Sequence, residues 1–396
     1  MPDTNQPAEV TEAAVLEALS HVNDPDLKKS LTSLGMIDNI RICGGDIGFD
    51  LVLTTTACPL KEMIKDDARK AVEAVPGVSS VSVQISGKTL SAKVPQREAL
   101  PGIKNIVAVS SGKGGVGKST VAVNLACAIA KQGGRVGILD ADIYGPNVPL
   151  MMGLSEASIK TMDDNGKLIP PENHGVKVMS MAFLVKDDQP VVWRGPMLDK
   201  VIRQFLNDTS WGELDYLIVD LPPGTGDAQL TIIQATPVIG AVIVTTPQDV
   251  AVLDSRKGLA MFKNANVPVF GIVENMSYYQ LPDGSQDYIF GKDGGKAAAE
   301  EIGVPFLGEV PILSRLGADA QDINSGTPIT VANPASEQAK VLSSVADQVV
   351  AKICDMSFAP DEAQTKEPEQ DLGHEHGPNC AHEHDHEQEH SHPVSV

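Results

Sequence analysis

The pattern of apolar and polar residues divides the chain into two regions of different period, followed by a polar tail. In the first region, Thr11 is a suitable N-cap for the first of two segments with helical spacing. Two other segments alternate as half-buried strands do. The expected helices are 11–22 and 60–75, and the expected strands are 46–59 and 78–86. Together they predict a small α+β domain over residues 1–95.

From residue 105 onward, short apolar strands alternate with helices. The expected strands are 105–111, 135–142, 214–224, 239–248 and 267–276, and the expected helices are 119–133, 249–265 and 333–353. Strands that are apolar throughout are typical of a parallel sheet covered by helices on both faces. The pattern therefore predicts an α/β domain over residues 105–353. A linker is expected over 96–104, within a stretch that holds two prolines and a glycine.

Residues 354–396 form a tail of different composition, for which we expect disorder. From 355 onward it holds eleven Asp and Glu against a single Lys, about half of the net charge of −21. Seven of the nine histidines also lie here, among them His382, His384 and His386, with Cys380 beside them. Imidazoles at alternate positions in a flexible acidic chain can bind Zn²⁺ or Ni²⁺, whereas a merely solubilising tail is the alternative.

The acidic charge and the aromatic content of 4% argue against a nucleic-acid-binding protein. No apolar run is long enough to span a membrane, and the polar N-terminus lacks the core of a secretory signal. The five cysteines are odd in number and widely spaced. We therefore expect a cytoplasmic protein without a membrane or nucleic-acid partner, whose thiols are reduced or bind metal.

The segment from Gly112 to Ser119 fits the phosphate-binding pattern G-x-x-x-x-G-K-[ST] in full. It follows an expected strand and opens an expected helix, as phosphate binding by backbone N–H groups and the helix dipole requires. We expect Lys118 to reach the β- and γ-phosphates of ATP and Ser119 to hold Mg²⁺. The residues expected to contact the nucleotide are Gly112, Lys113, Gly114, Gly115, Val116, Gly117, Lys118, Ser119 and Thr120.

Carboxylates follow two of the other expected strands. Asp220 ends one strand and is our candidate for Mg²⁺ binding through water. Asp140 and Asp142 follow another strand, and Asp142 is our candidate for polarising the attacking water. For Asp227, a turn or capping role is as plausible as a catalytic one.

Lys113 is a second lysine at the front of the loop. It is poorly aimed at the γ-phosphate of its own chain, so we expect it to reach the nucleotide of a second copy and to act as an arginine finger does. That role requires a homodimer that encloses two ATP molecules. A solvated surface lysine is the alternative.

The string KGGVGKST, followed by LDADIYGPNVP and VDLPPGTGD, resembles the MinD/ParA-like ATPases. WRGPMLDKVIRQFL and GIVENMSYY narrow the resemblance to the Mrp/ApbC iron–sulfur cluster carriers, and TTTACP resembles the small domain fused ahead of many of them. The resemblance implies a slow homodimeric ATPase that binds a [4Fe–4S] cluster between subunits. It also implies transfer to apo iron–sulfur proteins, cluster scaffold proteins as further partners, and contact of Asn275 with the nucleotide base.

The chain departs from this family where the family carries its C-x-x-C. Leu281 and Gly284 stand at those two positions, and neither can ligate iron. Among the other cysteines, Cys127 is expected in the core and Cys43 in a structural role. Cys58 ends a strand just before a helix, where a thiolate is favoured, so it is a candidate ligand for sulfur or metal, with a plain structural role as the alternative.

The interpretation that combines these features is an ATP-hydrolysing carrier or assembly protein for iron–sulfur clusters. One alternative is a regulatory ATPase switch of the MinD/ParA kind. Another is a nucleotide-driven Ni²⁺ or Zn²⁺ metallochaperone that uses the histidine tail.

Overall fold

The computed structural model describes residues 10–25, 27–43, 45–53, 55, 57–87, 89, 91, 100–155, 162–183, 195–281, 283–312 and 326–357. One compact unit covers Met1–Phe358, and the remainder, Ala359–Val396, lies outside the described residues. The predictions made for Cys380, His382, His384 and His386 concern that remainder.

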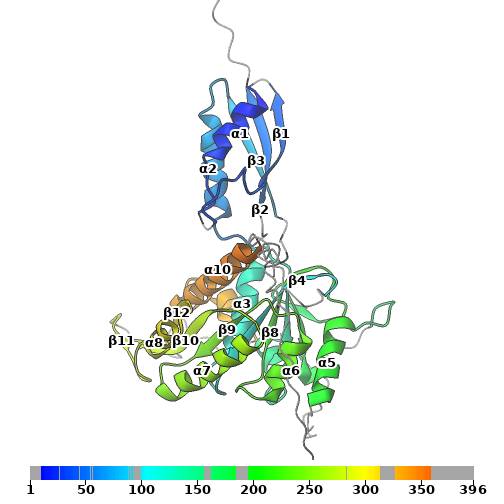
Figure 1. The fold of residues 1–396 in the computed structure, drawn as a ribbon, viewed down its shortest axis with the longest axis vertical. Helices are drawn as coiled ribbons and strands as arrows, with labels where there is room; N and C mark the ends of the chain where they lie inside the picture. Colours follow the sequence, from blue (N-terminus) through cyan, green and yellow to red (C-terminus); the bar gives the residue numbers. More distant parts are fainter. Residues whose placement is uncertain are drawn as a thin grey trace, which may run out of the picture. The chain divides into compact units, whose positions relative to one another are not determined.

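The N-terminal part of the unit is a three-stranded sheet with two helices (Figure 1). Its elements are α1 Glu12–Ser20, β1 Ile37–Cys43, β2 Asp46–Leu53, α2 Lys61–Glu73 and β3 Ser80–Gly87. The predicted cap is confirmed, because the Thr11 hydroxyl accepts a hydrogen bond from the Ala14 N–H. The sequence analysis missed β1, whose residues are mostly exposed and so do not alternate. β2 pairs with β1 in antiparallel and with β3 in parallel fashion, and α2 connects the two parallel strands.

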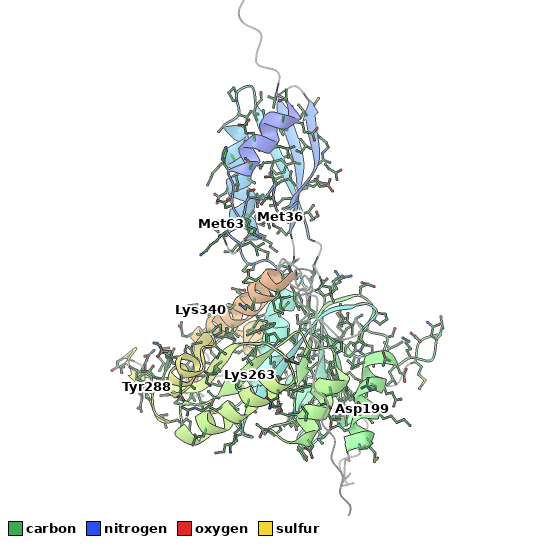
Figure 2. All side chains as sticks on the ribbon, viewed as in Figure 1. Met36, Met63, Asp199, Lys263, Tyr288 and Lys340 are labelled. Carbon is green, nitrogen blue, oxygen red and sulfur yellow. The ribbon has the colours of Figure 1, made fainter. Side chains whose placement is uncertain are left out.

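The core of this sheet follows from the alternation in β2. Ile47, Phe49, Leu51 and Leu53 are buried while the residues between them are not, since successive side chains of a strand point to opposite faces. Figure 2 labels two methionines of this part of the chain, one inside the core and one outside it. Met36 is buried within it, whereas Met63 of α2 faces away and is 45% exposed.

In the described part of the chain, the second sheet has nine strands in the order β11-β10-β9-β4-β8-β5-β7-β6, with β12 paired to β10. Its strands are β4 Ile103–Ser111, β5 Val136–Asp140, β6 Glu172–Asn173, β7 Val176–Ser180, β8 Leu214–Asp220, β9 Gly240–Thr245, β10 Val269–Gln280, β11 Gln286–Asp287 and β12 Phe306–Ile312. Its helices are α3 Lys118–Lys131, α4 Val148–Met151, α5 Gly195–Asn207, α6 Asp227–Ala235, α7 Asp249–Asn264, α8 Gly294–Ile302, α9 Ile329–Ala332 and α10 Glu337–Ser357.

The sheet is parallel except for β6 and β11, which pair in antiparallel fashion with β7 and β10. Side chains of α3 and α10 share one hydrophobic cluster with one face of the sheet, and those of α5, α6, α7 and α8 share another with the opposite face (Figure 1). Within β8, Tyr216 and Ile218 belong to the first cluster and Leu217 and Val219 to the second. The predicted parallel sheet with two helical layers is therefore confirmed.

This topology brings the candidate residues together. β4, β5 and β8 are adjacent parallel strands, so their carboxyl ends meet at one edge of the sheet. Ser111 ends β4 just ahead of the glycine-rich loop, while Asp140 and Asp220 end β5 and β8. Ligands of open α/β sheets bind at such an edge.

Candidate nucleotide site

The glycine-rich loop connects β4 directly to α3. Gly115 and Gly117 have φ values of 82° and 84°, a left-handed conformation that side-chain-bearing residues rarely adopt. Gly117 is the residue before the first turn of α3, and a Cβ there would collide with the Asn275 amide. The two glycines therefore let the loop curl at the helix N-terminus, where unpaired N–H groups favour an anion.

Lys118 lies beneath this loop and contacts two carboxylates. Its Nζ is 2.7 Å from Asp220 Oδ1 and 3.4 Å from Asp142 Oδ2, and its side chain is only 6% exposed. The Ser119 hydroxyl is 3.3 Å from the same nitrogen. The structure thus brings together four residues that the sequence analysis singled out separately.

Asp140 was not among the predicted site residues, although it is completely buried at the same place. Its Oδ2 accepts hydrogen bonds from the Ser180 hydroxyl and the Val148 N–H, and its Oδ1 accepts one from the Asp142 N–H. Burial, and then the charge of Asp220, raise the pKa of Asp140 above its usual range. The pair of aspartates in LDAD was the available signal, but only the fold shows that both are buried, Asp140 completely and Asp142 with 7% exposed.

Asp220 is equally buried, and burial raises its pKa although the charge of Lys118 acts in the opposite direction. Its Oδ1 pairs with the lysine, whereas its Oδ2 has no hydrogen-bond partner among the described residues. The Ser119 hydroxyl lies near enough to Asp220 to lower that pKa. A buried carboxylate oxygen without a partner, close to a hydroxyl, is a donor set that suits Mg²⁺.

Asn275 lies under the loop. It is buried, and its amide donates a hydrogen bond of 2.8 Å to the Val116 carbonyl. The structure therefore shows Asn275 in contact with the loop backbone, and its predicted contact with the base stays a prediction.

Lys113 is exposed at the front of the loop. It lines a cavity of about 140 Å³ together with Gly114, Gly115, Gln248, Met276 and Phe290. Neither a hydrogen bond nor an ion pair of its ammonium group is seen within the described part of the chain. Its role stays a prediction.

The positions of the missing C-x-x-C lie at the connection between β10 and β11. Leu281 and Gly284 close a turn there through a hydrogen bond of 2.9 Å, and Gly284 has a φ of 85°. Tyr288, labelled in Figure 2, follows this turn and stacks at a tilt on Tyr278, with ring centroids 6.0 Å apart. The hairpin is thus supported by an aromatic contact.

The described cysteines differ in environment, and none of them forms a disulfide. Cys127 is buried in α3 as predicted, and burial raises the pKa of its thiol to about 12. Cys43 is exposed and Cys58 is partly buried. The described residues hold no group of three or more His, Cys, Asp or Glu side chains that could bind a metal ion. They also include no helix that is long and apolar enough to cross a membrane.

Two family models match the chain. One, described as NUBPL iron-transfer P-loop NTPase, matches residues 102–350, and the other, described as iron-sulfur cluster assembly protein, matches residues 12–85. Both agree with the resemblance inferred from the motifs.

Curated relatives agree with these matches. An iron-sulfur cluster carrier protein of Synechocystis sp. is 53% identical over 87% of this chain and 98% of its own length. An iron-sulfur cluster carrier protein of Deinococcus radiodurans is 50% identical over 86% of this chain and 95% of its own length. A solved nucleotide-binding protein in complex with ADP from Archaeoglobus fulgidus is 36% identical over 67% of this chain and 93% of its own, with a TM-score of 0.48. The chain therefore belongs to the NUBPL iron-transfer P-loop NTPase family.

Proposed function

We propose that this protein is an ATP-hydrolysing carrier of iron–sulfur clusters that works as a slow homodimer in the cytoplasm. The family match and the carrier relatives support the cluster-handling role. The observation that carries the ATPase role is the position of Lys118 between Asp142 and Asp220, directly under the loop. The proposal includes the division into a small domain over 1–95, a linker and an ATPase domain over 105–353, which the matches at 12–85 and 102–350 support.

Binding of ATP needs the loop and Lys118. The loop N–H groups donate hydrogen bonds to the phosphate oxygens at the positive end of α3, and the ammonium group of Lys118 turns from Asp220 toward the β- and γ-phosphates. The triphosphate thus replaces the carboxylate as the counter-charge of the lysine. Asn275 supports the loop from below through the Val116 carbonyl.

Once the ammonium group of Lys118 has turned toward the phosphates, Asp220 can hold a cation together with Ser119. Mg²⁺ fits this pair, because one oxygen of Asp220 already has no hydrogen-bond partner among the described residues. When bound, Mg²⁺ would neutralise part of the charge that develops on the phosphate oxygens.

Hydrolysis needs a base and a further positive charge. Asp142 Oδ2 lies 3.4 Å from Lys118 Nζ, while its Oδ1 accepts hydrogen bonds from the N–H groups of Tyr144 and Gly145. We propose that Asp142 takes up a proton from the attacking water while the bond between the γ-phosphorus and the leaving oxygen of ADP breaks. Lys113 of a second copy would offset the charge of the transition state.

The cluster-handling step must use thiols other than those of the β10–β11 turn, where Leu281 and Gly284 stand. Cys58 is the candidate in the small domain. Recipient apo-proteins and scaffold proteins would supply the thiolates that hold the assembled [4Fe–4S] cluster.

Mixing two inactive variants tests the dimeric mechanism. Lys113→Ala should retain ATP binding and lose turnover by on the order of 10³-fold, and Asp142→Asn should also be inactive. In a mixed dimer, the site of the Lys113→Ala chain keeps its own Asp142 and receives Lys113 from its partner. Phosphate release by the mixture should therefore exceed that of either variant alone. A mixture no more active than its components would contradict the action of Lys113 across the dimer.

Anaerobic reconstitution tests the carrier role. The protein incubated with iron, sulfide and ATP should activate an apo-enzyme that needs a [4Fe–4S] cluster, and Lys118→Ala should not. Hydrolysis of ATP without any transfer would instead favour the regulatory ATPase switch.

A further inference from the structure

A small cavity beside α10 is lined by two cysteines far apart in the sequence. Cys58 comes from the loop after β2, and Cys354 from the last turn of α10. Asp24 and Thr55 also line this cavity. Only Cys58 was singled out from the sequence, because nothing in the chain order indicates that the two cysteines meet.

The loop that carries Cys58 is anchored on both sides of the cavity. The Thr55 hydroxyl is 2.6 Å from the Tyr216 hydroxyl of β8 and accepts a hydrogen bond of 3.1 Å from the Ala57 N–H. Ala57 is completely buried in the same hydrophobic cluster as α3 and α10. Cys58 is therefore held at a defined place relative to α10, as a ligand must be.

The size of the cavity limits what it can hold. The space open to the centre of a water-sized sphere is about 20 Å³. A single water needs roughly 10–15 Å³ measured in this way, so one water or one metal ion fits, whereas an assembled [4Fe–4S] cluster does not.

The charges around the cavity favour a cation. The C-terminal end of α10 carries the negative end of the helix dipole, and Cys354 lies within that last turn. The buried carboxylate of Asp24 adds negative charge at the cavity wall. Cys58 precedes the first turn of α2, and its carbonyl accepts a hydrogen bond from the Lys61 N–H.

We propose that Cys58 and Cys354 form a two-thiolate site for a single thiophilic transition-metal ion of the iron or zinc type. Binding forms two metal–sulfur bonds, releases the two thiol protons and changes no oxidation state. Thiolates do not suit Mg²⁺, so the site differs from the nucleotide site in the metal it selects. It deepens the proposed function, since a carrier without cysteines in the β10–β11 turn needs thiols elsewhere.

The small number of ligands has a chemical consequence. Structural sites close around zinc with four protein ligands, whereas sites that exchange ligands keep positions open. Two thiolates leave coordination positions for sulfide or for a thiol of a recipient protein. The site is therefore suited to hold an ion transiently and pass it on.

Titration of the full-length chain with Co²⁺ tests the proposal. Cys380→Ala is the background, so that the tail carries no thiol while its histidines stay. We expect a near-ultraviolet thiolate-to-cobalt charge-transfer band that saturates at one ion per chain. The band should be lost in Cys58→Ser and in Cys354→Ser, and it should persist in Cys43→Ser, the matched control for an exposed cysteine outside the cavity. No band, or a band that survives either cavity substitution, would overturn the proposal.

A second measurement needs no variant. Zn²⁺ should protect both Cys58 and Cys354 of the wild-type protein from alkylation, read by peptide mass spectrometry, and leave Cys43 reactive; Mg²⁺ should protect neither. Protection of only one of the two would contradict a shared ion. Wild-type ATPase activity is measured in parallel. Normal hydrolysis without thiol protection refutes this inference alone, whereas protection without hydrolysis refutes the proposed ATPase mechanism alone.

Discussion

Lys118 should stabilise the nucleotide-free protein as well as bind phosphate, and Lys118→Met separates the two roles. The lysine side chain is 6% exposed and its partners Asp220 and Asp142 are 0% and 10% exposed. Removing one partner of a buried ion pair typically costs about 3–5 kcal/mol, because the other charge stays buried without compensation. Since aspartate can take up a proton instead, we expect the lower limit, about 3 kcal/mol, or roughly 100-fold in the folding equilibrium.

The pH dependence of this loss has a defined sign. Burial already raises the pKa of Asp220, and removal of Lys118 deletes the main influence that lowers it. A carboxyl group whose pKa is higher in the folded than in the unfolded state supports folding while it is protonated. That contribution is complete below the unfolded pKa and is lost as the pH rises through the folded pKa. The deficit of Lys118→Met relative to wild type should therefore grow as the pH rises from below the ordinary aspartate pKa toward neutrality.

Urea denaturation followed by circular dichroism, without nucleotide, measures this effect. Lys131→Met is the matched control, because Lys131 is an exposed lysine in the last turn of the same helix and should cost less than about 1 kcal/mol. Lys118→Met/Asp220→Asn should regain much of the loss, since it removes the uncompensated charge. Equal losses for Lys118→Met and the control, or a double variant no more stable than the single one, would refute the reasoning.

Three further predictions concern other parts of the chain. Asp140→Asn should flatten the decline in thermal stability between the ordinary aspartate pKa of about 4 and about pH 8, because burial raises the pKa of Asp140 to about 8 in the folded protein; melting temperatures measured against pH give the answer, and an unchanged profile contradicts the assignment. Thr55→Val should lower the free energy of unfolding, measured by urea denaturation, by about 1–3 kcal/mol, because the buried Tyr216 hydroxyl loses its partner. The double variant with Tyr216→Phe should lose less than the sum of the two single changes, whereas additive losses would show that the two residues are not coupled. Replacing His382, His384 and His386 with alanine in the full-length chain should lower the number of Ni²⁺ or Zn²⁺ ions bound per chain, as measured by calorimetry. An unchanged stoichiometry would favour a merely solubilising tail.

The sequence alone determined the fold class and most of the larger elements. Apolar strands, helical periods and glycine spacing are local properties, and each acts over a few residues. The parallel sheet, the loop between β4 and α3, and the helices α2, α7 and α10 were accordingly predicted. The strands β1, β7 and β12 and the helices α5, α6 and α8 were not predicted. β1 is mostly exposed, and β12 lies partly buried without a clear alternation.

The tertiary structure decided which predicted residues meet and how buried they are. It placed the ends of β5 and β8 side by side, so that the fully buried Asp140 became part of the site together with Asp142, which is 7% exposed. It also brought Cys58 and Cys354 to one cavity, although about 300 residues separate them in the chain. Pairing between distant segments depends on the packing of all the elements between them. No local pattern in the sequence carries that information, and the charge and burial of each site residue depend on it.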